Sequence, residues 1–247
     1  MNPATLIMRK APVAAAGGFP TTLAGLVIWC DASDAASITH SAGAVSQWSD
    51  KSGNARHILQ ASAALKPVTG LTQFNGLNVL TFNGAKAMHG ASAQYVNGTT
   101  GEWTAFIVLR QTTTGSTCAP FNAMNVGNPV AQMLILGTGW LQAHAYNTAD
   151  AMFQHEPGTI GVNTIACVSS LRTATTVDVR KNGVAGGTTA TTGTPKATAV
   201  IFNIGAAYND SQNFVGEFAE FFMYNRALNS TERANAEAYL KTKWGIP

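Results

Sequence analysis

Alternating aromatic and polar residues from position 140 onward are the part of this sequence best suited to contact a ligand. The segment WLQAHAYN begins at residue 140, and its odd positions are small or apolar. The side chains of interest stand at the even positions, Trp140, Gln142, His144 and Tyr146. If this segment is a strand, alternation places all four on one face. Rings that stack on a sugar beside amide and imidazole hydrogen-bonding groups predict a glycan-binding groove. The same residues also suit a subunit interface or a half-exposed sheet under a loop.

A pair of carboxylates that could hydrolyse a glycosidic bond is not evident. Glycoside hydrolases need two such groups on either side of the scissile bond. The closest approach to a pair is Glu217 and Glu220, whose odd separation places them on opposite faces of a regular strand. We therefore expect no catalytic residue and no enzyme.

Other kinds of site are equally poorly supported. The histidines show no H-E-x-x-H spacing, no G-x-S-x-G elbow is present, and no phosphate-binding glycine loop opens a helix. The three cysteines, Cys30, Cys118 and Cys167, have neither metal-type nor redox-type spacing and cannot all pair. We interpret them as small buried thiols and expect no cofactor.

Three aspartates near the start of the sequence suggest two different roles. Asp31, Asp34 and Asp50 carry the hard oxygen atoms that calcium prefers. Alternatively, Asp50 and Ser52 brace a tight loop through hydrogen bonds from side chain to backbone. No second carboxylate lies within two residues of Asp50, so loop bracing is favoured and no metal is expected.

Composition narrows the class of protein further. Charged residues form 11% of the 247, against about 25% in an average soluble domain, and the formal net charge is +3. The basic residues are dispersed, with adjacent pairs only at Arg9-Lys10 and Arg180-Lys181, so nucleic acid is not an expected partner. No apolar run of about eighteen residues predicts a membrane span. Residues 1–20 lack the apolar core of a signal peptide, so we expect synthesis in the cytoplasm without ordinary export.

Periodicity predicts short strands followed by one helix. Apolar runs separated by Gly, Asn and Thr begin near Leu26 and continue to Tyr224, with no helical crossover between them. Asn229 and Glu232 form a capping-box-like helix start, and the apolar stripe that follows predicts a helix over residues 230–244. The Ala- and Gly-rich residues 1–24 have no periodicity and are interpreted as a flexible arm.

Four segments in order carry a family resemblance. Residues 26–34, 45–54 with its W-x-D-x-S-G-N pattern, 75–84 and 214–228 resemble the bacterial and bacteriophage branch of the concanavalin A-like lectin/glucanase (laminin-G-like) superfamily. The resemblance implies an all-β, antiparallel jelly-roll β-sandwich with one short C-terminal α-helix, spanning residues 25–247. The E-x-D-x-x-E strand that supplies the catalytic pair in laminarinase-like relatives has no counterpart here.

Two functional hypotheses follow from these features. The first is a non-enzymatic bacteriophage virion protein, a head decoration or a tail component, that residues 1–24 anchor to other virion proteins. Its location is then the virion, and a homo-oligomer is a common arrangement for such projections. The alternative is an extracellular bacterial module for glycan binding or adhesion. The two are compatible, because a displayed lectin-like domain can also bind surface glycans.

Overall fold

The computed structural model describes residues 19–125, 128–198, 201–207 and 210–247. Every strand pairing in this part of the chain is antiparallel, and the strands form two packed sheets. Two short 3₁₀ turns lie in the connections, at Ala35–Ser37 and Ala63–Leu65. The expected all-β sandwich with one terminal helix is confirmed.

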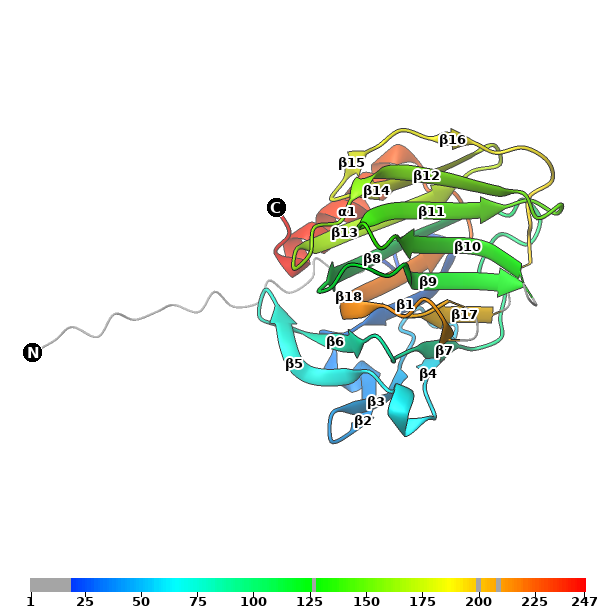
Figure 1. The fold of residues 1–247 in the computed structure, drawn as a ribbon. Coiled ribbons are helices and arrows are strands. Elements are labelled where there is room, and N and C mark those ends of the chain that lie inside the picture. Colours follow the sequence, from blue (N-terminus) through cyan, green and yellow to red (C-terminus); the bar gives the residue numbers. More distant parts are fainter. Residues whose placement is uncertain (1–18, 126–127, 199–200, 208–209) are drawn as a thin grey trace, which may run out of the picture.

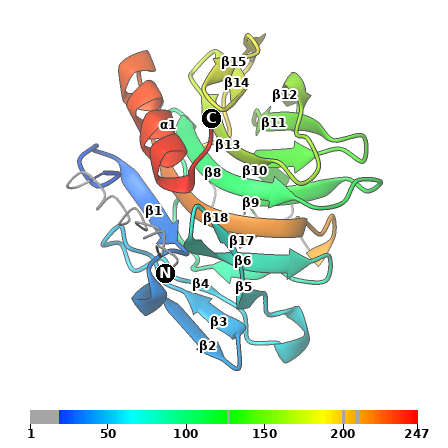
Figure 2. The same ribbon diagram turned by 90° about the vertical axis from the view of Figure 1, so that its left-hand side faces the viewer.

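The first sheet is centred on β18 (Val215–Tyr224). On one side β18 pairs with β1 (Leu26–Asp31) and β6 (Leu77–Asn83), and β6 pairs with β5 (Val68–Phe74). The other side continues through β8 (Trp103–Gln111), β13 (Ile165–Arg172), β14 (Thr176–Lys181), and the short β15 (Val184–Ala185) and β16 (Thr189–Ala190). The helix lies against this sheet (Figure 2).

The second sheet begins at the edge strand β12 (Met152–Thr159). It continues in spatial order through β11 (Trp140–Tyr146), β10 (Asn128–Ile135), β9 (Cys118–Asn125), β17 (Ile201–Ile204), β7 (Met88–Gly90), β4 (Ile58–Leu59), β3 (Ala44–Trp48) and β2 (Ile38–Ser41). Figure 1 shows β9 to β12 running side by side in front of β8 and β13. One residue pair between β3 and β5 joins the two sheets.

Strand alternation divides the apolar residues between two cores. Phe221 of β18 points between the two sheets, where residues such as Phe121 and Met133 of the second sheet meet it. Its neighbour Phe222 points the other way and packs with Leu240 and the helix. The molecule is therefore layered as helix, first sheet and second sheet. The outer face of the second sheet is opposite the helix.

The C-terminal helix α1 (Ser230–Trp244) covers the predicted range. Its start is stabilised by a full capping box, in which the Asn229 side chain accepts from the Glu232 backbone N–H and the Glu232 side chain accepts in return. Gly245 ends it with a left-handed φ of 67°. None of the described helices is long and apolar enough to cross a membrane.

The described part of the predicted arm is packed against the domain. The Phe19 ring lies 5.1 Å from that of Tyr239, measured between centroids, and the Tyr224 hydroxyl donates to the Pro20 carbonyl oxygen at 2.8 Å. These contacts make residues 19–24 part of the packed domain, which therefore begins earlier in the sequence than the predicted residue 25. Residues 1–18 lie outside the described residues, so for them the arm stays a prediction.

Candidate functional site

The four ligand-binding candidates lie on β11, on the outer face of the second sheet. Leu141, between two of them, points into the core, so alternation places the even positions outward. Trp140 is 42% exposed, whereas Gln142 and His144 are buried and Tyr146 is half-buried. His144 Nε2 is 2.8 Å from Gln142 Oε1. Only Trp140 therefore offers a broad open surface, and the ligand-binding role of the four stays a prediction.

Strand register extends this face into a row of polar residues across the second sheet, here called the polar row. Each member of the row is directly opposite the next, with one exception: Leu59 of β4 lies between His89 of β7 and Gln47 of β3. In spatial order the row comprises Gln154, His144, Gln132, Asn122, Asn203, His89, Gln47 and Thr39. Directly paired residues point to the same face of a sheet. The ends of the row are accessible and its centre is buried.

The centre of the polar row has unmet hydrogen-bonding capacity. Asn122 Oδ1 and His144 Nδ1 are buried, and neither has a partner among the described residues. An unsatisfied buried polar atom costs about 1–3 kcal/mol. Burial lowers the pKa of His144 to about 4, against the opposing effect of Glu156, so its ring is neutral at pH 7. The centre is therefore uncharged and able to accept further hydrogen bonds.

Sequence reasoning found one member of the row's centre and missed three. Asn122, Gln132 and Asn203 are polar residues flanked by apolar neighbours within three separate strands. Local alternation marks each of them as outward-facing, but only the pairing of β10 with β9 and of β9 with β17 brings them together.

The three aspartates near the start of the sequence, Asp31, Asp34 and Asp50, are held by protein groups. Asp50 accepts hydrogen bonds from the backbone N–H groups of Trp29, Ser52 and Arg56 at 2.8–2.9 Å. This is the predicted bracing of a loop, extended to the neighbouring strand β1. Its oxygens are consequently engaged with hydrogen-bond donors.

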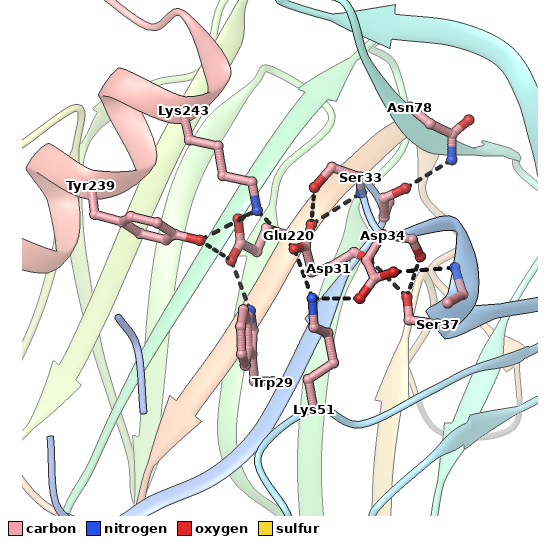
Figure 3. A network of polar contacts seen from close by, with 12 residues as sticks. Trp29, Asp31, Ser33, Asp34, Ser37, Lys51, Asn78, Glu220, Tyr239 and Lys243 are labelled. Atoms are coloured by element: carbon pink, nitrogen blue, oxygen red, sulfur yellow. Dashed lines mark hydrogen bonds and ion pairs between the residues drawn. The ribbon is translucent and has the colours of Figure 1, made fainter. Parts of the chain in front are cut away.

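Asp31 and Asp34 interact with lysines (Figure 3). Lys51 Nζ lies 3.2 Å from Asp31 Oδ2 and 2.7 Å from Asp34 Oδ2, and Lys243 Nζ lies 2.9 Å from Asp31 Oδ2. Burial opposes the ionisation of Asp31, but Lys243, Ser33 and Lys51 outweigh it and hold its pKa below the usual value. Ammonium groups thus stand where a cation would bind, and within the described chain no three potential ligands form a metal cluster. The donor set does not fit calcium.

The prediction that Glu217 and Glu220 point to opposite faces is wrong. The register of β18 against β8 shifts between Phe218 and Glu220, so that Glu217 faces Arg110 and Glu220 faces Val108. Two residues of β8 that are two apart share a face, and both glutamates therefore point toward the helix side. Glu217 is held by the Arg110 guanidinium through bonds of 2.9 and 3.0 Å. The bulge changes the geometry, but this carboxylate is still committed to a structural ion pair.

Glu220 is fully buried and accepts four hydrogen bonds. Figure 3 shows three of the donors, Trp29, Tyr239 and Lys243. The donors are Trp29 Nε1 and Tyr239 Oη to Oε1, and Lys243 Nζ and Trp244 Nε1 to Oε2, at 2.8–3.0 Å. Burial, followed by the neighbouring negative charge of Asp31, raises the pKa of Glu220 in spite of Lys243. The opening strand, the closing strand and the helix meet at this carboxylate.

A recess of about 390 Å³ lies at one end of the sandwich, beside the β8–β9 connection. Its lining side chains are neutral and include Gln111, Thr113, Thr117 and Asn213. Cys118 also lines it, and burial raises the pKa of that thiol to about 12. All three cysteines are unpaired and buried, as predicted.

Comparison with known proteins places the fold in a broad class. No family model matches the chain, and no curated protein matches it. Among solved structures it is similar to the binding domain of Paraclostridial Mosquitocidal Protein 1, with 13% identity and a TM-score of 0.62 over 90% of this chain and 55% of that one. The binding domain of botulinum neurotoxin serotype G gives 9% identity and a TM-score of 0.66 over 90% and 54%. The chain thus spans about half the length of these two.

A third solved structure is matched over nearly its whole length. Domain 4 of AbnA, a GH43 extracellular arabinanase from Geobacillus stearothermophilus, in complex with arabinotriose, gives 14% identity and a TM-score of 0.62 over 86% of this chain and 98% of that one. At these identities the likeness shows the fold alone. The chain has a β-sandwich fold that also occurs in the binding domains of two toxins and in an arabinanase domain solved with bound arabinotriose.

Proposed function

We propose that this chain is a non-catalytic carbohydrate-binding module whose ligand lies on the polar row and stacks on Trp140. One observation carries the proposal. Across the outer face of a sheet, amide and imidazole side chains stand in register, and two of their atoms, Asn122 Oδ1 and His144 Nδ1, have no partner in the described chain. Both atoms are buried, so the groups that cover them have to move aside when a ligand binds. Sugar hydroxyl groups can then supply both partners, because a hydroxyl donates and accepts.

The charge of the row favours a neutral saccharide. Its central residues Asn203, Asn122 and Gln132 carry amides, and the pKa of His144, lowered by burial to about 4, keeps the ring neutral. Adjacent strands lie about 4.8 Å apart, so contacts recur at a regular interval across the sheet. A chain of sugar units that runs across the strands can contact several members of the polar row at once. Trp140 provides an exposed aromatic surface on the same face, four residues before His144 on β11.

The solved structures support the class of function. The printed description of the arabinanase domain names bound arabinotriose, and the toxin domains are described as binding domains. Transfer of a binding role to this chain is our inference from the shared fold together with the polar row. The commitment of Glu217 and Glu220 to internal ion pairs and hydrogen bonds supports a module without hydrolytic activity.

Retention on immobilised neutral polysaccharides tests the proposal. Trp140→Ala removes an exposed ring and is expected to weaken retention at least about tenfold without loss of stability. Val184→Ala is the matched control, because Val184 is 71% exposed on β15, away from the row. Asn122→Ala, checked for folding by circular dichroism, is expected to weaken retention as well. If Trp140→Ala and Asn122→Ala both bind as tightly as the native chain, the site is refuted. If the native chain binds no glycan on a broad array, the function is refuted.

We further propose that the module is displayed on a bacteriophage particle, with residues 1–18 as its attachment to other virion proteins. The small proportion of charged residues and the aperiodic Ala- and Gly-rich N-terminal segment support this setting. Deletion of residues 1–18 is expected to abolish incorporation into particles while leaving the thermal unfolding of the domain unchanged. Incorporation of the deleted form at full occupancy contradicts it.

A further inference from the structure

Two buried carboxylates, Asp31 and Glu220, contact the same lysine nitrogen atom, Lys243 Nζ. Asp31 ends β1, Glu220 lies directly opposite it on β18, and Lys243 is in the last turn of α1. Lys243 Nζ is 2.9 Å from Asp31 Oδ2 and 2.8 Å from Glu220 Oε2 (Figure 3). An amine is thus held in contact with one carboxyl group that could become an amide and with a second that could accept its proton.

We propose that Lys243 and Asp31 condense within the folded chain into an amide cross-link, with Glu220 as the proton acceptor. The bond joins Lys243 Nζ to Asp31 Cγ, and Asp31 Oδ2 leaves as water. The reaction takes place once in each chain. It is independent of the proposed carbohydrate-binding function, because the polar row lies on the opposite side of the molecule from the helix.

The surroundings of the three side chains exclude most of the water, which favours formation of the amide. The side chains of Asp31 and Glu220 are 6% and 0% exposed, and that of Lys243 is 14% exposed. The Trp244 and Tyr239 rings lie 5.0 and 5.6 Å from Lys243 Nζ. A site with little water strengthens the internal electrostatic interactions and disfavours hydrolysis of the product. Fixed contact between reacting groups supplies a large effective concentration.

The second oxygen of Asp31 is placed to carry the charge that develops during attack. Asp31 Oδ1 accepts a hydrogen bond from the Ser33 backbone N–H at 3.0 Å and from the Ser33 hydroxyl at 2.6 Å. Two donors on one oxygen form the arrangement that stabilises a tetrahedral intermediate in acyl transfer. This oxygen becomes the carbonyl oxygen of the amide and keeps both hydrogen bonds.

The proton transfers balance without an external reactant. Lys51 Nζ, 3.2 Å from Asp31 Oδ2, first protonates this oxygen and converts Asp31 into a neutral acid. Glu220 takes one proton from the Lys243 ammonium, and the amine then attacks Asp31 Cγ. The proton held by Glu220 passes to Oδ2 and completes the departing water. Lys51 recovers the second proton that the attacking nitrogen releases. Lys243 thus loses two protons, Asp31 loses one oxygen, and Glu220 and Lys51 return to their starting states.

Glu220 distinguishes Lys243 from Lys51 as the nucleophile. Both lysines contact Asp31, but only Lys243 also contacts Glu220, whose pKa is raised by burial and by the charge of Asp31. Lys51 instead contacts the more exposed Asp34. The cross-link would close a covalent ring from residue 31 to residue 243, so the first strand and the helix could not separate under load.

Mass spectrometry of the intact native chain, purified under denaturing conditions after folding, tests the proposal. The expected mass is that of the sequence less one water, and proteolysis is expected to release a branched peptide that joins Asp31 to Lys243. Sequence mass after prolonged incubation of the folded chain overturns the proposal. A branched peptide through Lys51 overturns the assignment of the nucleophile. Loss of water without a branched peptide indicates a cyclic imide at an aspartate and also overturns it.

Two variants separate the reaction from the fold. Lys243→Arg keeps a cation against Asp31 and Glu220 but has no amine that can form this amide, and Glu220→Gln removes the proton acceptor. Both are expected to retain the full sequence mass, with folding confirmed by circular dichroism. Lys66→Arg, at a half-buried position in the connection before β5, is the control and is expected to lose one water like the native chain. Water loss at the native level in Lys243→Arg refutes the chemistry.

Discussion

Arg233 provides a direct test of how the helix is attached to the first sheet. Its side chain is 1% exposed, and its guanidinium donates to Asp178 Oδ1 on β14 and to the Ser169 hydroxyl and carbonyl oxygens on β13. Arg233→Met keeps a similar length of apolar side chain and removes every donor. The Asp178 carboxylate, with a side chain 10% exposed, then loses its ion-pair partner.

The magnitude of the effect follows from that burial. Removing one partner of a buried ion pair costs about 3–5 kcal/mol. Because water can reach part of Asp178, we expect the lower end, about 3 kcal/mol. For a domain of this size that corresponds to a decrease in melting temperature of about 6–12 °C. Urea unfolding followed by tryptophan fluorescence measures the change, and the dependence on urea concentration should be unaltered.

A double-mutant cycle identifies the cause. If the cost arises from an unpaired charge, Arg233→Met combined with Asp178→Leu is less destabilising than the sum of the single changes, by at least about 1 kcal/mol. A loss below about 1 kcal/mol for Arg233→Met would refute this reasoning. Strict additivity in the cycle would refute it as well, since the destabilisation would then come from packing.

Three further predictions concern local features. Hydrogen bonding to Arg226 lowers the pKa of Glu232 from 4.5 to about 2. The contribution of the Glu232 carboxylate to stability is therefore complete above pH 4.5 and is lost as pH falls toward 2. Glu232→Gln should remove this pH dependence from acid unfolding curves. Burial lowers the pKa of His144 from 6.5 to about 4, so stability should fall as pH decreases from 6.5 to 4 because the unfolded chain binds the proton first; an NMR titration of the ring with a midpoint at 6.5 would contradict this. Gly216→Ala should cost at least about 2 kcal/mol in urea unfolding, because a Cβ would lie 2.0 Å from the Arg110 carbonyl oxygen at a backbone φ of +149°; an unchanged midpoint would show that β18 can shift there.

Local patterns determined much of the fold. Alternating residues predicted that Trp140, Gln142, His144 and Tyr146 share one face, and the structure places them there. The capping box at Asn229 and the apolar stripe after it predicted the helix with its observed ends. These features depend on neighbours within a few residues, and their physical causes, strand alternation and satisfied helix ends, act over that range.

Register and long-range packing decided the rest. A single-residue shift in β18 places Glu217 and Glu220 on the same face, because one extra residue reverses every side chain that follows it in the strand. The polar row exists because strands far apart in the sequence pair at particular residues.

The same is true of the Asp31, Glu220 and Lys243 cluster, whose members come from both ends of the domain. Asp31 and Asp34 were noted in the sequence as acidic residues, but their contacts with Lys51 and Lys243 were not predicted. The free energy of such contacts is shared between distant segments, and no local pattern records which segments will meet. The sequence by itself therefore determined the elements and their faces, and the tertiary structure decided which faces and side chains act together.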